Sequence, residues 1–457
     1  MTLRWTAQEV ARIAGGSLEH LPAHQEIQGV SIDSRTLTPG QLFVALQGER
    51  HHGITFVEQA LERGAVAVLS DRRPRGAAVP LIRVQDPRAA LIHLARVARM
   101  RLKARIVGIT GSVGKTTAKD LVAHLLAARY RVHQAPKSYN NFIGLPLTLL
   151  NAPRDTQVLV LELGTNHPGE MNQLAAIARP HVALLTAVAE AHLGFFGSLE
   201  AIAREKATLF YHTVPGPVFV NEALEPFFEL FRRVLPEGVD LVPFGPHSQG
   251  IRNPETGLEA NRWQWQGRSW ISRPGGPGPL AVALGAVALA LHLEVPLEVV
   301  HERLATFQPP AMRMQVFRRD DITVVNDAYN ANPASVENLL ETLASRSDRV
   351  LLVLGDMREL GAFSEALHRR VARRAFQLGF RRLVAVGPEA RFYVEELRKE
   401  PMDLLAHFTR PEEAAATVRK ALKPGDLLAL KASRAVALET LLDRLWPRQP
   451  AEIGGTR

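Results

Sequence analysis

One stretch, from Arg105 to Ala128, constrains the fold of this chain more than any other. It reads RIVGITGSVGKTTAKDLVAHLLAA. The apolar run Ile106 to Ile109 predicts a buried strand, and the apolar residues after Thr117 recur at the spacing of one helix face. Between them lies a loop, Thr110 to Thr117, with two glycines, a lysine and three threonines. A strand, a glycine loop and a helix in this order form a cradle for phosphate, because loop amides and a helix N-terminus carry partial positive charge.

Each position of this loop has an expected role. The lysine would reach the β- and γ-phosphates of a nucleotide, and the threonine after it would ligate Mg²⁺. The usual G-x-x-x-x-G-K-[ST] pattern is not met, because its first position is Ile109. A tight strand-to-helix turn with a surface lysine is the simpler alternative. The residues predicted to bind nucleotide are Gly111, Ser112, Gly114, Lys115, Thr116 and Thr117.

Composition narrows the class of protein. The length of 457 residues suggests about three domains. The chain has no cysteine, which excludes disulfides and thiolate metal sites. No apolar run approaches the ~18 residues of a membrane span, and the N-terminus lacks a signal-peptide core, so we expect a cytoplasmic enzyme. The net charge of +9 is scattered and accompanies no helix-turn-helix, zinc-finger or RNP-like pattern, so we expect no nucleic-acid partner.

The pattern along the chain predicts an α/β protein of three domains. Residues 1–103 are expected to form a small α/β domain, and residues 104–312 a central ATPase-like domain with a parallel sheet around the phosphate loop. Residues 313–446 alternate strand and helix, which predicts a doubly wound, Rossmann-like domain. Residues 447–457 are expected to form a disordered tail.

Three side chains outside the loop suggest chemistry. Glu162 ends the apolar strand QVLVLEL, where a parallel-sheet nucleotide site needs a Mg²⁺ ligand. A strand-end acid that faces solvent is the alternative. His192 follows another buried strand, where a hydrogen-bonded loop histidine is the commoner case. Lys206 lies at the edge of a helix's apolar face, a position that normally holds a snorkelling surface lysine.

Polar clusters follow other strands. Asn140 and Asn141 precede a predicted Gly-x-Pro turn, where they could bind phosphate or cap the turn. The cluster NDAYNANP contains Asp327, Tyr329 and Asn330, and its Asn-Pro pair predicts a helix start. The segments GDMRELG and KASR also follow predicted strands. Ligands bind at the carboxyl edge of such sheets, so these clusters are candidates for a site.

Taken together, these motifs resemble the Mur ligases of peptidoglycan synthesis over nearly the whole chain. The resemblance rests on DSRTLTPGQLFVALQG, GITGSVGKTT, NNFIGLPLTLL, LELGTNHPGEM, AHLGFFGSLEAIAREKATLF, NDAYNANPASVENLL, VLGDMRELG and LKASR. NNFIGLPLTLL, YNANP and GDMRELG are similar to the branch that joins D-alanyl-D-alanine to the UDP-N-acetylmuramoyl tripeptide. That branch implies ATP-dependent amide ligation through an acyl phosphate, by a monomer in the cytoplasm.

The resemblance also implies roles for single residues. Lys115 would bind the γ-phosphate, Thr116 and Glu162 would hold one Mg²⁺, and His192 would help to hold a second. Lys206 matches a lysine that related ligases carbamylate, which makes it a metal ligand. The remaining implied roles are Asn140 in catalysis, Arg313 and Asp327 at the nucleotide, and Ser34, Arg35, Asn141, Tyr329 and Asn330 at the substrates.

This chain departs from the family pattern at four places. The family's asparagine after Ser112 is Val113, and its Lys-Gly-Ser-Arg has Ala432. An Asp-Gly-His in the first domain is His52-Gly53-Ile54. The His-Asn and later Asn that contact adenine in the family are replaced by Gly278, Pro279 and Val282.

Two alternatives stay open at this point. One is another member of the ligase superfamily, such as an earlier Mur step or folylpolyglutamate synthase. The other is a nucleotide-dependent binding module without ligase activity, which would leave Glu162, His192 and Lys206 unexplained.

Overall fold

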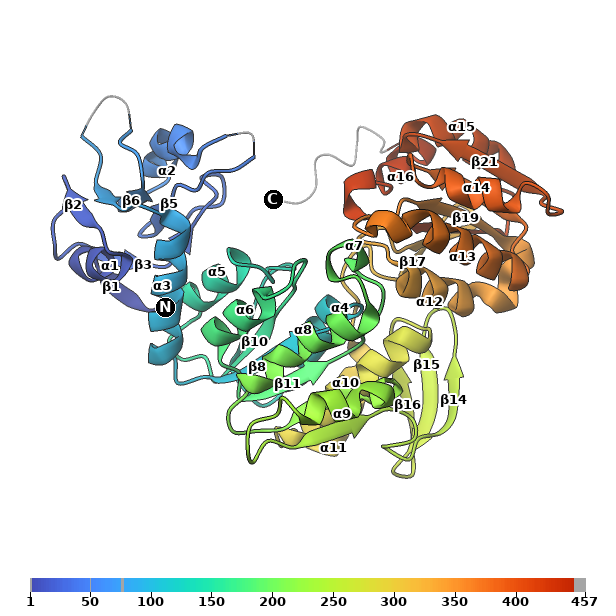
Figure 1. Ribbon diagram of the computed structural model, residues 1–457, viewed down its shortest axis with the longest axis horizontal. Helices are drawn as coiled ribbons and strands as arrows, with labels where there is room; N and C mark the ends of the chain where they lie inside the picture. Colours follow the sequence, from blue (N-terminus) through green and yellow to red (C-terminus); the bar gives the residue numbers. More distant parts are fainter. Residues whose placement is uncertain (1, 50, 75–77, 448–457) are drawn as a thin grey trace.

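A computed structural model describes residues 2–49, 51–74 and 78–447, and Figure 1 shows three α/β units along the chain. The first unit (blue) lies at one side of the central unit (green to yellow), and the third (orange to red) lies at the other. Apart from Pro447, the predicted tail lies outside the described residues. Within those residues, no helix is long and apolar enough to cross a membrane.

The N-terminal unit is built on a five-stranded sheet of order β2-β7-β6-β5-β4. Thr6 caps the first helix through a capping box with Glu9, and Asp86 caps α3 with Pro87 at its first position. The elements are β1 Arg4–Thr6, α1 Ala7–Ala14, β2 Ser17–Glu19, β3 Glu26–Gln28, β4 Val30–Ser31, β5 Leu42–Val44, the 3₁₀ helix η1 Gly53–Phe56, α2 Val57–Glu62, β6 Ala67–Ser70, β7 Leu81–Arg83 and α3 Pro87–Arg101.

The central unit has a parallel six-stranded sheet of order β13-β12-β11-β8-β10-β9. The predicted strand and helix around the phosphate loop are β8 and α4. The elements are β8 Arg105–Thr110, α4 Lys115–Leu126, β9 Val132–Gln134, α5 Gly144–Leu150, β10 Val158–Glu162, α6 Glu170–Ala178, β11 Val182–Leu185, α7 Leu193–Phe196, α8 Leu199–Tyr211, β12 Val218–Asn221, η2 Glu222–Phe227, α9 Phe228–Arg232, β13 Leu241–Phe244, α10 Pro277–His292 and α11 Leu297–Thr306.

Two local predictions in this unit were wrong. The expected Gly-x-Pro turn is the first turn of α5, which accepts Pro146 because the first amides of a helix have no helical partner. The glycine- and proline-rich stretch RPGGPGP at 273–279 predicts a loop, but this loop ends early because Pro277 begins α10. The sequence patterns also predicted none of the antiparallel strands β14 Arg252–Thr256, β15 Asn261–Trp265 and β16 Arg268–Ser272.

The C-terminal unit has a sheet of order β17-β18-β22-β19-β20-β21, in which only the edge strand β17 is antiparallel. Helices α12, α13 and α14 cover one face, and α15 and α16 cover the other. This is the predicted doubly wound arrangement. The elements are β17 Gln315–Arg319, β18 Ile322–Asn326, α12 Pro333–Leu343, η3 Ala344–Arg349, β19 Val350–Gly355, η4 Gly361–Phe363, α13 Ser364–Gln377, β20 Arg382–Val386, α14 Arg391–Leu397, β21 Leu404–Phe408, α15 Pro411–Ala421, β22 Leu427–Lys431, η5 Arg434–Val436 and α16 Thr440–Leu445.

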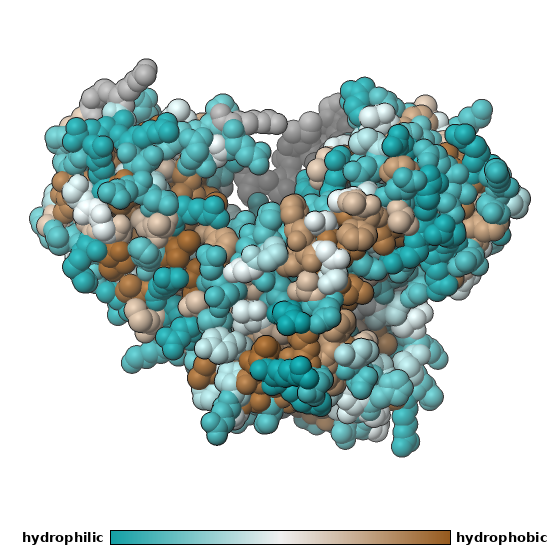
Figure 2. Space-filling view, in the orientation of Figure 1, coloured by the Kyte–Doolittle hydropathy of each residue, from teal (hydrophilic) through white to brown (hydrophobic). Residues whose placement is uncertain are grey.

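The first two units share one hydrophobic core. Helix α3 packs on α5 and α6, and buried side chains of both units form a continuous cluster. The junction also has polar contacts, since Asn151 exchanges hydrogen bonds with the backbone of Val30 at 2.9 Å in each direction. Figure 2 shows the surface hollowed between the N-terminal and C-terminal units, above the central unit. The N-terminal unit and the central unit are therefore packed together through one continuous core.

Candidate active site

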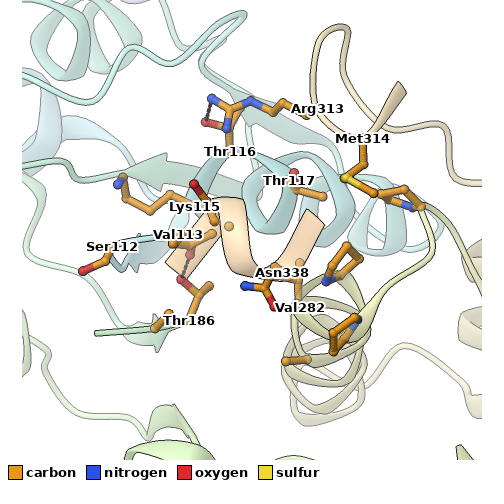
Figure 3. A pocket seen from close by; sticks show the side chains of 18 of the residues that line it. Ser112, Val113, Lys115, Thr116, Thr117, Thr186, Val282, Arg313, Met314 and Asn338 are labelled. Carbon is orange, nitrogen blue, oxygen red and sulfur yellow. Dashed lines mark hydrogen bonds between the residues drawn. The ribbon is translucent and has the colours of Figure 1, made fainter. Parts of the chain in front are cut away.

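The main cavity, of about 800 Å³, lies where the central and C-terminal units meet. The carboxyl ends of β8, β10, β11 and β12 border it on one side, and those of β18 and β22 on the other. Two sheets thus present to one cavity the edges at which such folds bind ligands. Figure 3 shows the phosphate loop in this cavity, with Arg313 above it and Val282 and Asn338 below it in that view.

The two glycines of the phosphate loop are required by its geometry. Gly111 has φ +154°, and a Cβ there would lie 2.0 Å from the Thr186 hydroxyl oxygen. Gly114 has φ +84°, and its Cβ would lie 2.7 Å from a methyl of Val282. Only glycine combines these backbone angles with such close neighbours. The loop is therefore clamped between the end of β11 and the start of α10.

Several side chains of this loop line the cavity, and one of them, Ser112, also holds the loop in place. Lys115 donates to the Gly111 carbonyl at 2.7 Å, and desolvation lowers the pKa of its ammonium group. Thr117 also lines the cavity. The Ser112 hydroxyl instead donates to the Ala189 carbonyl at 3.1 Å and accepts from the Ala189 amide. Ser112 thus ties the loop to the segment that leads to His192.

A hydrogen-bond network surrounds the buried carboxylate of Glu162. One oxygen accepts from the Thr116 hydroxyl at 2.8 Å, and the other accepts from the Asn140 amide at 2.8 Å. Arg313 donates to the same Thr116 hydroxyl at 2.9 Å and to Ser138 at 3.2 Å. The structure therefore brings together four residues that the sequence singled out separately. Hydroxyl and carboxylate oxygens side by side are the donors that Mg²⁺ prefers when phosphate supplies the rest.

The C-terminal unit contributes a second polar group, centred on Asp327. Its carboxylate accepts from the Met314 amide at 3.0 Å and from the ammonium group of Lys431. The ring of Tyr329 lies 4.0 Å from the guanidinium carbon of Arg313, in a cation–π contact. Asp327, Tyr329 and Lys431 line the cavity together with Arg313. Arg313 and Met314, which connect the central and C-terminal units, therefore contact both sides of the cavity.

His192 lies outside the cavity lining, at a joint between the central and C-terminal units. Its Nδ1 contacts the carboxylate of Glu359, which lowers the pKa of that carboxyl. Both residues have a left-handed backbone conformation, with φ +58° and +66°. This conformation is costly for residues other than glycine and is often found at functional sites. The Gly194 amide donates to the Glu359 carbonyl at 3.1 Å, and Gly361 approaches Gly194 so closely that a Cβ on either would clash.

Lys206 also lies outside the cavity lining. It is 2% exposed, and burial lowers the pKa of its amine to about 7, with the positive charge of Lys115 as the next cause. The neighbouring Glu205 accepts from the amides of Gly169 and Met171, so its carboxylate caps α6. A buried lysine that titrates near neutrality is a functional candidate rather than a surface group.

The protein side chains alone do not form a closed metal site. In the described parts of the chain, no three His, Asp or Glu side chains converge as metal ligands do. Thr116 and Glu162 suit a magnesium ion that shares its ligands with bound phosphate. His192 supplies one further nitrogen, and Lys206 cannot ligate a cation as an ammonium. Only the first of the two predicted magnesium sites thus has its protein ligands in contact.

The other residues predicted to bind substrate lie away from the cavity, make hydrogen bonds or ion pairs with nearby residues, or lie at its rim. The Ser34 hydroxyl donates to Gln59 at 2.6 Å, and the exposed Arg35 pairs with Asp33 at 2.8 Å. The Asn141 side chain accepts from the Gly144 amide at 3.0 Å and so caps α5. Asn330 is exposed at the cavity rim.

Family models, curated relatives and solved structures match this chain over most of its length. The models named Mur ligase family catalytic domain, Mur ligase middle domain, and Mur ligase glutamate ligase domain match residues 26–99, 109–265 and 312–434. The UDP-N-acetylmuramoyl-tripeptide–D-alanyl-D-alanine ligase of Bacillus subtilis is 32% identical, over 97% of this chain and 98% of its own. The enzyme of that name from Treponema pallidum is 36% identical over 90% of this chain and 92% of its own.

The chain belongs to the Mur ligase family. Among solved Mur ligase structures, MurF from Acinetobacter baumannii superposes with a TM-score of 0.86 at 29% identity, over 98% of this chain and all of that one. MurF from Thermotoga maritima, solved in complex with ADP, has a TM-score of 0.78 at 26% identity, with 92% and 97% covered. The three-domain fold predicted for a Mur ligase is confirmed.

At the end of the cavity away from Arg313, residues at the family's adenine-contact positions, such as Val282, meet residues that the sequence patterns did not indicate. It is lined by Pro277, Leu280 and Val282 of α10 and by Asn338 and Leu339 of α12. The buried Asn261 fixes the loop before α10, since it accepts from the Gly276 amide at 2.8 Å and donates to the Pro274 carbonyl at 3.2 Å. No local pattern indicates Asn338 or Leu339, because this end of the cavity forms only when two domains meet.

Proposed function

We propose that this chain joins D-alanyl-D-alanine to the UDP-N-acetylmuramoyl tripeptide in an ATP-dependent amide ligation of peptidoglycan synthesis. It is an ATP-dependent amide ligase by its family membership. The observation that carries the proposal is the phosphate loop joined to the Thr116–Glu162–Asn140 network, at a cavity between two domains. The relatives that carry this activity in their names match nearly the whole chain.

In the first step, a terminal carboxylate oxygen of the tripeptide attacks the γ-phosphorus of ATP, and ADP leaves with the bridging oxygen. This converts a poor electrophile into an acyl phosphate. Lys115 and the loop amides would hold the γ-phosphate and stabilise the charge that develops on it. Mg²⁺ on Thr116 and Glu162 would neutralise further negative charge on the phosphates. Asn140 would keep the Glu162 carboxylate oriented, and Arg313 and Asp327 would bind the nucleotide.

In the second step, the amine of D-alanyl-D-alanine attacks the acyl carbon. The C–N bond forms, inorganic phosphate leaves, and the amine loses a proton. Closure of the domains would exclude water, which would otherwise hydrolyse the acyl phosphate. The His192–Glu359 joint supports such a closure, because it ties the segment after β11 to the C-terminal domain.

We further propose that Lys206 is carbamylated. The neutral amine adds to CO₂, an N–C bond forms, and one proton is lost, which leaves an anionic carbamate. Burial supports this reaction, because a pKa of about 7 leaves much of the amine neutral. The carbamate and His192 would then hold a second Mg²⁺. Carbon-13 NMR of protein equilibrated with ¹³C-bicarbonate should detect a carbamate carbon in the unaltered chain and none in Lys206→Met.

The remaining assignments concern substrates and assembly. Residues 1–103 would bind the UDP-muramoyl peptide, with Ser34 and Arg35 in contact with it. Residues 104–312 would bind ATP and residues 313–446 would complete the site, where Asn141, Tyr329 and Asn330 would meet phosphate or acceptor. We propose a monomer that binds no nucleic acid, which is consistent with a cavity built by one chain. ATP and UDP-linked precursors are cytoplasmic, so we place the reaction there.

The decisive experiment measures phosphate release from ATP with each UDP-muramoyl precursor and with D-Ala, D-Glu or D-alanyl-D-alanine as acceptor. Release only with the tripeptide and D-alanyl-D-alanine supports the proposal. Release with a shorter precursor and a single amino acid would reassign the chain to an earlier Mur step. Nucleotide binding without release under any pairing would contradict ligase activity.

A further inference from the structure

The apolar end of the main cavity lies between α10 and α12. A nucleotide whose phosphates lie on the loop amides must place its base elsewhere in the same cavity, because the sugar separates the two by only a few ångströms. The polar groups of Asp327, Lys431 and Arg313 already pair with one another or with the loop. The apolar end, between α10 and α12, suits the flat faces of a purine.

Helix α12 turns one face toward this cavity. Ser335, Asn338, Leu339 and Thr342 line it at the spacing of a single helix face. The Ser335 hydroxyl takes part in the capping box with Asn332, and the Thr342 hydroxyl donates to the backbone carbonyl of Asn338 at 2.7 Å. Within the described residues, the amide side chain of Asn338 has no hydrogen-bond partner. It is the polar side chain of this face that remains available to a ligand.

The start of α10 is shaped to admit this amide. A Cβ on Gly278 would lie 3.2 Å from the side-chain nitrogen and amide carbon of Asn338, which is tighter than ordinary contact. A Cβ on Gly276 would lie 2.3 Å from the Thr342 hydroxyl oxygen. Glycine at both positions therefore lets α12 approach α10. The same α10 carries Val282, which packs against the phosphate loop and offers no hydrogen bond to a base.

We propose that Asn338 selects adenine, by accepting from its 6-amino group and donating to an adjacent ring nitrogen. An amide offers a donor and an acceptor side by side, which matches the edge of adenine. A purine that lacks the 6-amino group leaves the acceptor without a partner, and guanine presents an acceptor where adenine has a donor. The selecting residue thus comes from the C-terminal domain, across the cavity from the phosphate loop. This inference rests on ATP being the nucleotide used.

Calorimetry with ADP and with purine riboside diphosphate, which lacks only the 6-amino group, tests the proposal on the full chain. The unaltered protein should bind ADP roughly tenfold more tightly, as expected for one lost hydrogen bond in a partly closed site. Asn338→Ala should bring the ratio close to one. Asn338→Leu keeps the side-chain size and should do the same, which separates lost hydrogen bonding from looser packing.

Thr116→Ala is the matched control, because it alters the phosphate end. It should weaken both diphosphates and leave their ratio unchanged. A ratio that stays near tenfold in both Asn338 variants would overturn the assignment of Asn338, while phosphate release with the ligase substrates could still succeed. Failure of the unaltered chain to bind ADP would overturn both this inference and the proposed use of ATP.

Discussion

The two ends of the nucleotide cavity are built in opposite ways. The phosphate end comes from one continuous segment, β8 to α4, with Glu162 added from the next strand of the same sheet. The base end combines α10 of the central domain with α12 of the C-terminal domain. The first is specified by a local motif and can be found by inspection of the sequence. The second is completed only by packing, since this chain lacks the family's adenine-contact motif in α10 and α12 carries no motif of its own.

The two ends also differ in their physical character. The phosphate end holds charged groups that meet at a hydroxyl: the Glu162 carboxylate accepts from the Thr116 hydroxyl, and Arg313 donates to the same hydroxyl. The base end is apolar, with the amide of Asn338 as its available polar group. We therefore expect most of the nucleotide affinity and all of the chemistry to depend on the phosphate end, and nucleotide selection to depend on the base end.

The largest effect is expected from Lys115→Ala. Loss of the ammonium group at the γ-phosphate should lower ligase turnover by at least about a thousandfold. Binding of the UDP-muramoyl peptide, measured by calorimetry, should persist because the N-terminal domain is unchanged. Lys420→Ala, on the exposed side of α15, is the matched control and should retain normal turnover. Near-normal turnover in Lys115→Ala would remove the phosphate loop from the mechanism.

Glu162→Gln should have the next largest effect. The change keeps the shape of the side chain and removes the negative charge that suits Mg²⁺, so metal affinity should fall by about 10- to 100-fold. Titration of Mn²⁺ by electron paramagnetic resonance with ADP present measures this directly. The ratio of ADP to purine riboside diphosphate affinity should not change. A change in this affinity ratio without a change in metal affinity would show that Glu162 acts on base selection, which would contradict separate roles for the two ends.

Lys206→Met tests the charge near the phosphate end through the pH dependence of stability. The folded-state pKa of about 7 lies below the usual 10.5, so unfolding takes up a proton between these values and stability rises with pH over that window. Below pH 7 the lysine is charged in both states, so the folded state bears the full cost of burying this charge. In CO₂-depleted buffer, the variant should be more stable than the unaltered chain at low pH, by on the order of a few kcal/mol, and the gain should vanish toward pH 10.

Lys119→Met is the control for this experiment. Lys119 is also buried, but its ammonium group donates to the carbonyls of Ala135 at 2.8 Å and Lys137 at 3.1 Å. Its removal leaves those carbonyls without a partner, so urea unfolding should show destabilisation at every pH. An equal gain in stability at low and high pH for Lys206→Met would contradict the lowered pKa.

The smallest effect is expected from Gly278→Ala. A methyl at this position would press on the Asn338 amide from 3.2 Å, so the Asn338 side chain must move by a few tenths of an ångström. ADP affinity should fall a few-fold, and the preference over purine riboside diphosphate should weaken with it. The Mg²⁺ requirement should stay as it is. A loss of metal affinity in this variant would show that the two ends of the cavity are coupled.

Much of the fold could be predicted because it rests on local periodicity. The C-terminal strands and helices were located from alternating apolar runs, and the helix start at Asn332 and Pro333 was recognised from its capping chemistry. The strands β14 to β16 were not, since β14 is exposed along its length and lacks an apolar face. Pro146 was interpreted as a turn, although the first turn of a helix tolerates proline equally well.

The sequence by itself determined the phosphate loop, the acid that ends a later apolar strand, and the polar clusters at strand ends, because each depends on neighbours along the chain. Only the tertiary structure decided how they meet. The contact of Asn140 with Glu162, the pairing of His192 with Glu359, and the place of Asn338 at the cavity join segments that are far apart in the chain. Such contacts follow from the packing of whole domains, which no local pattern encodes.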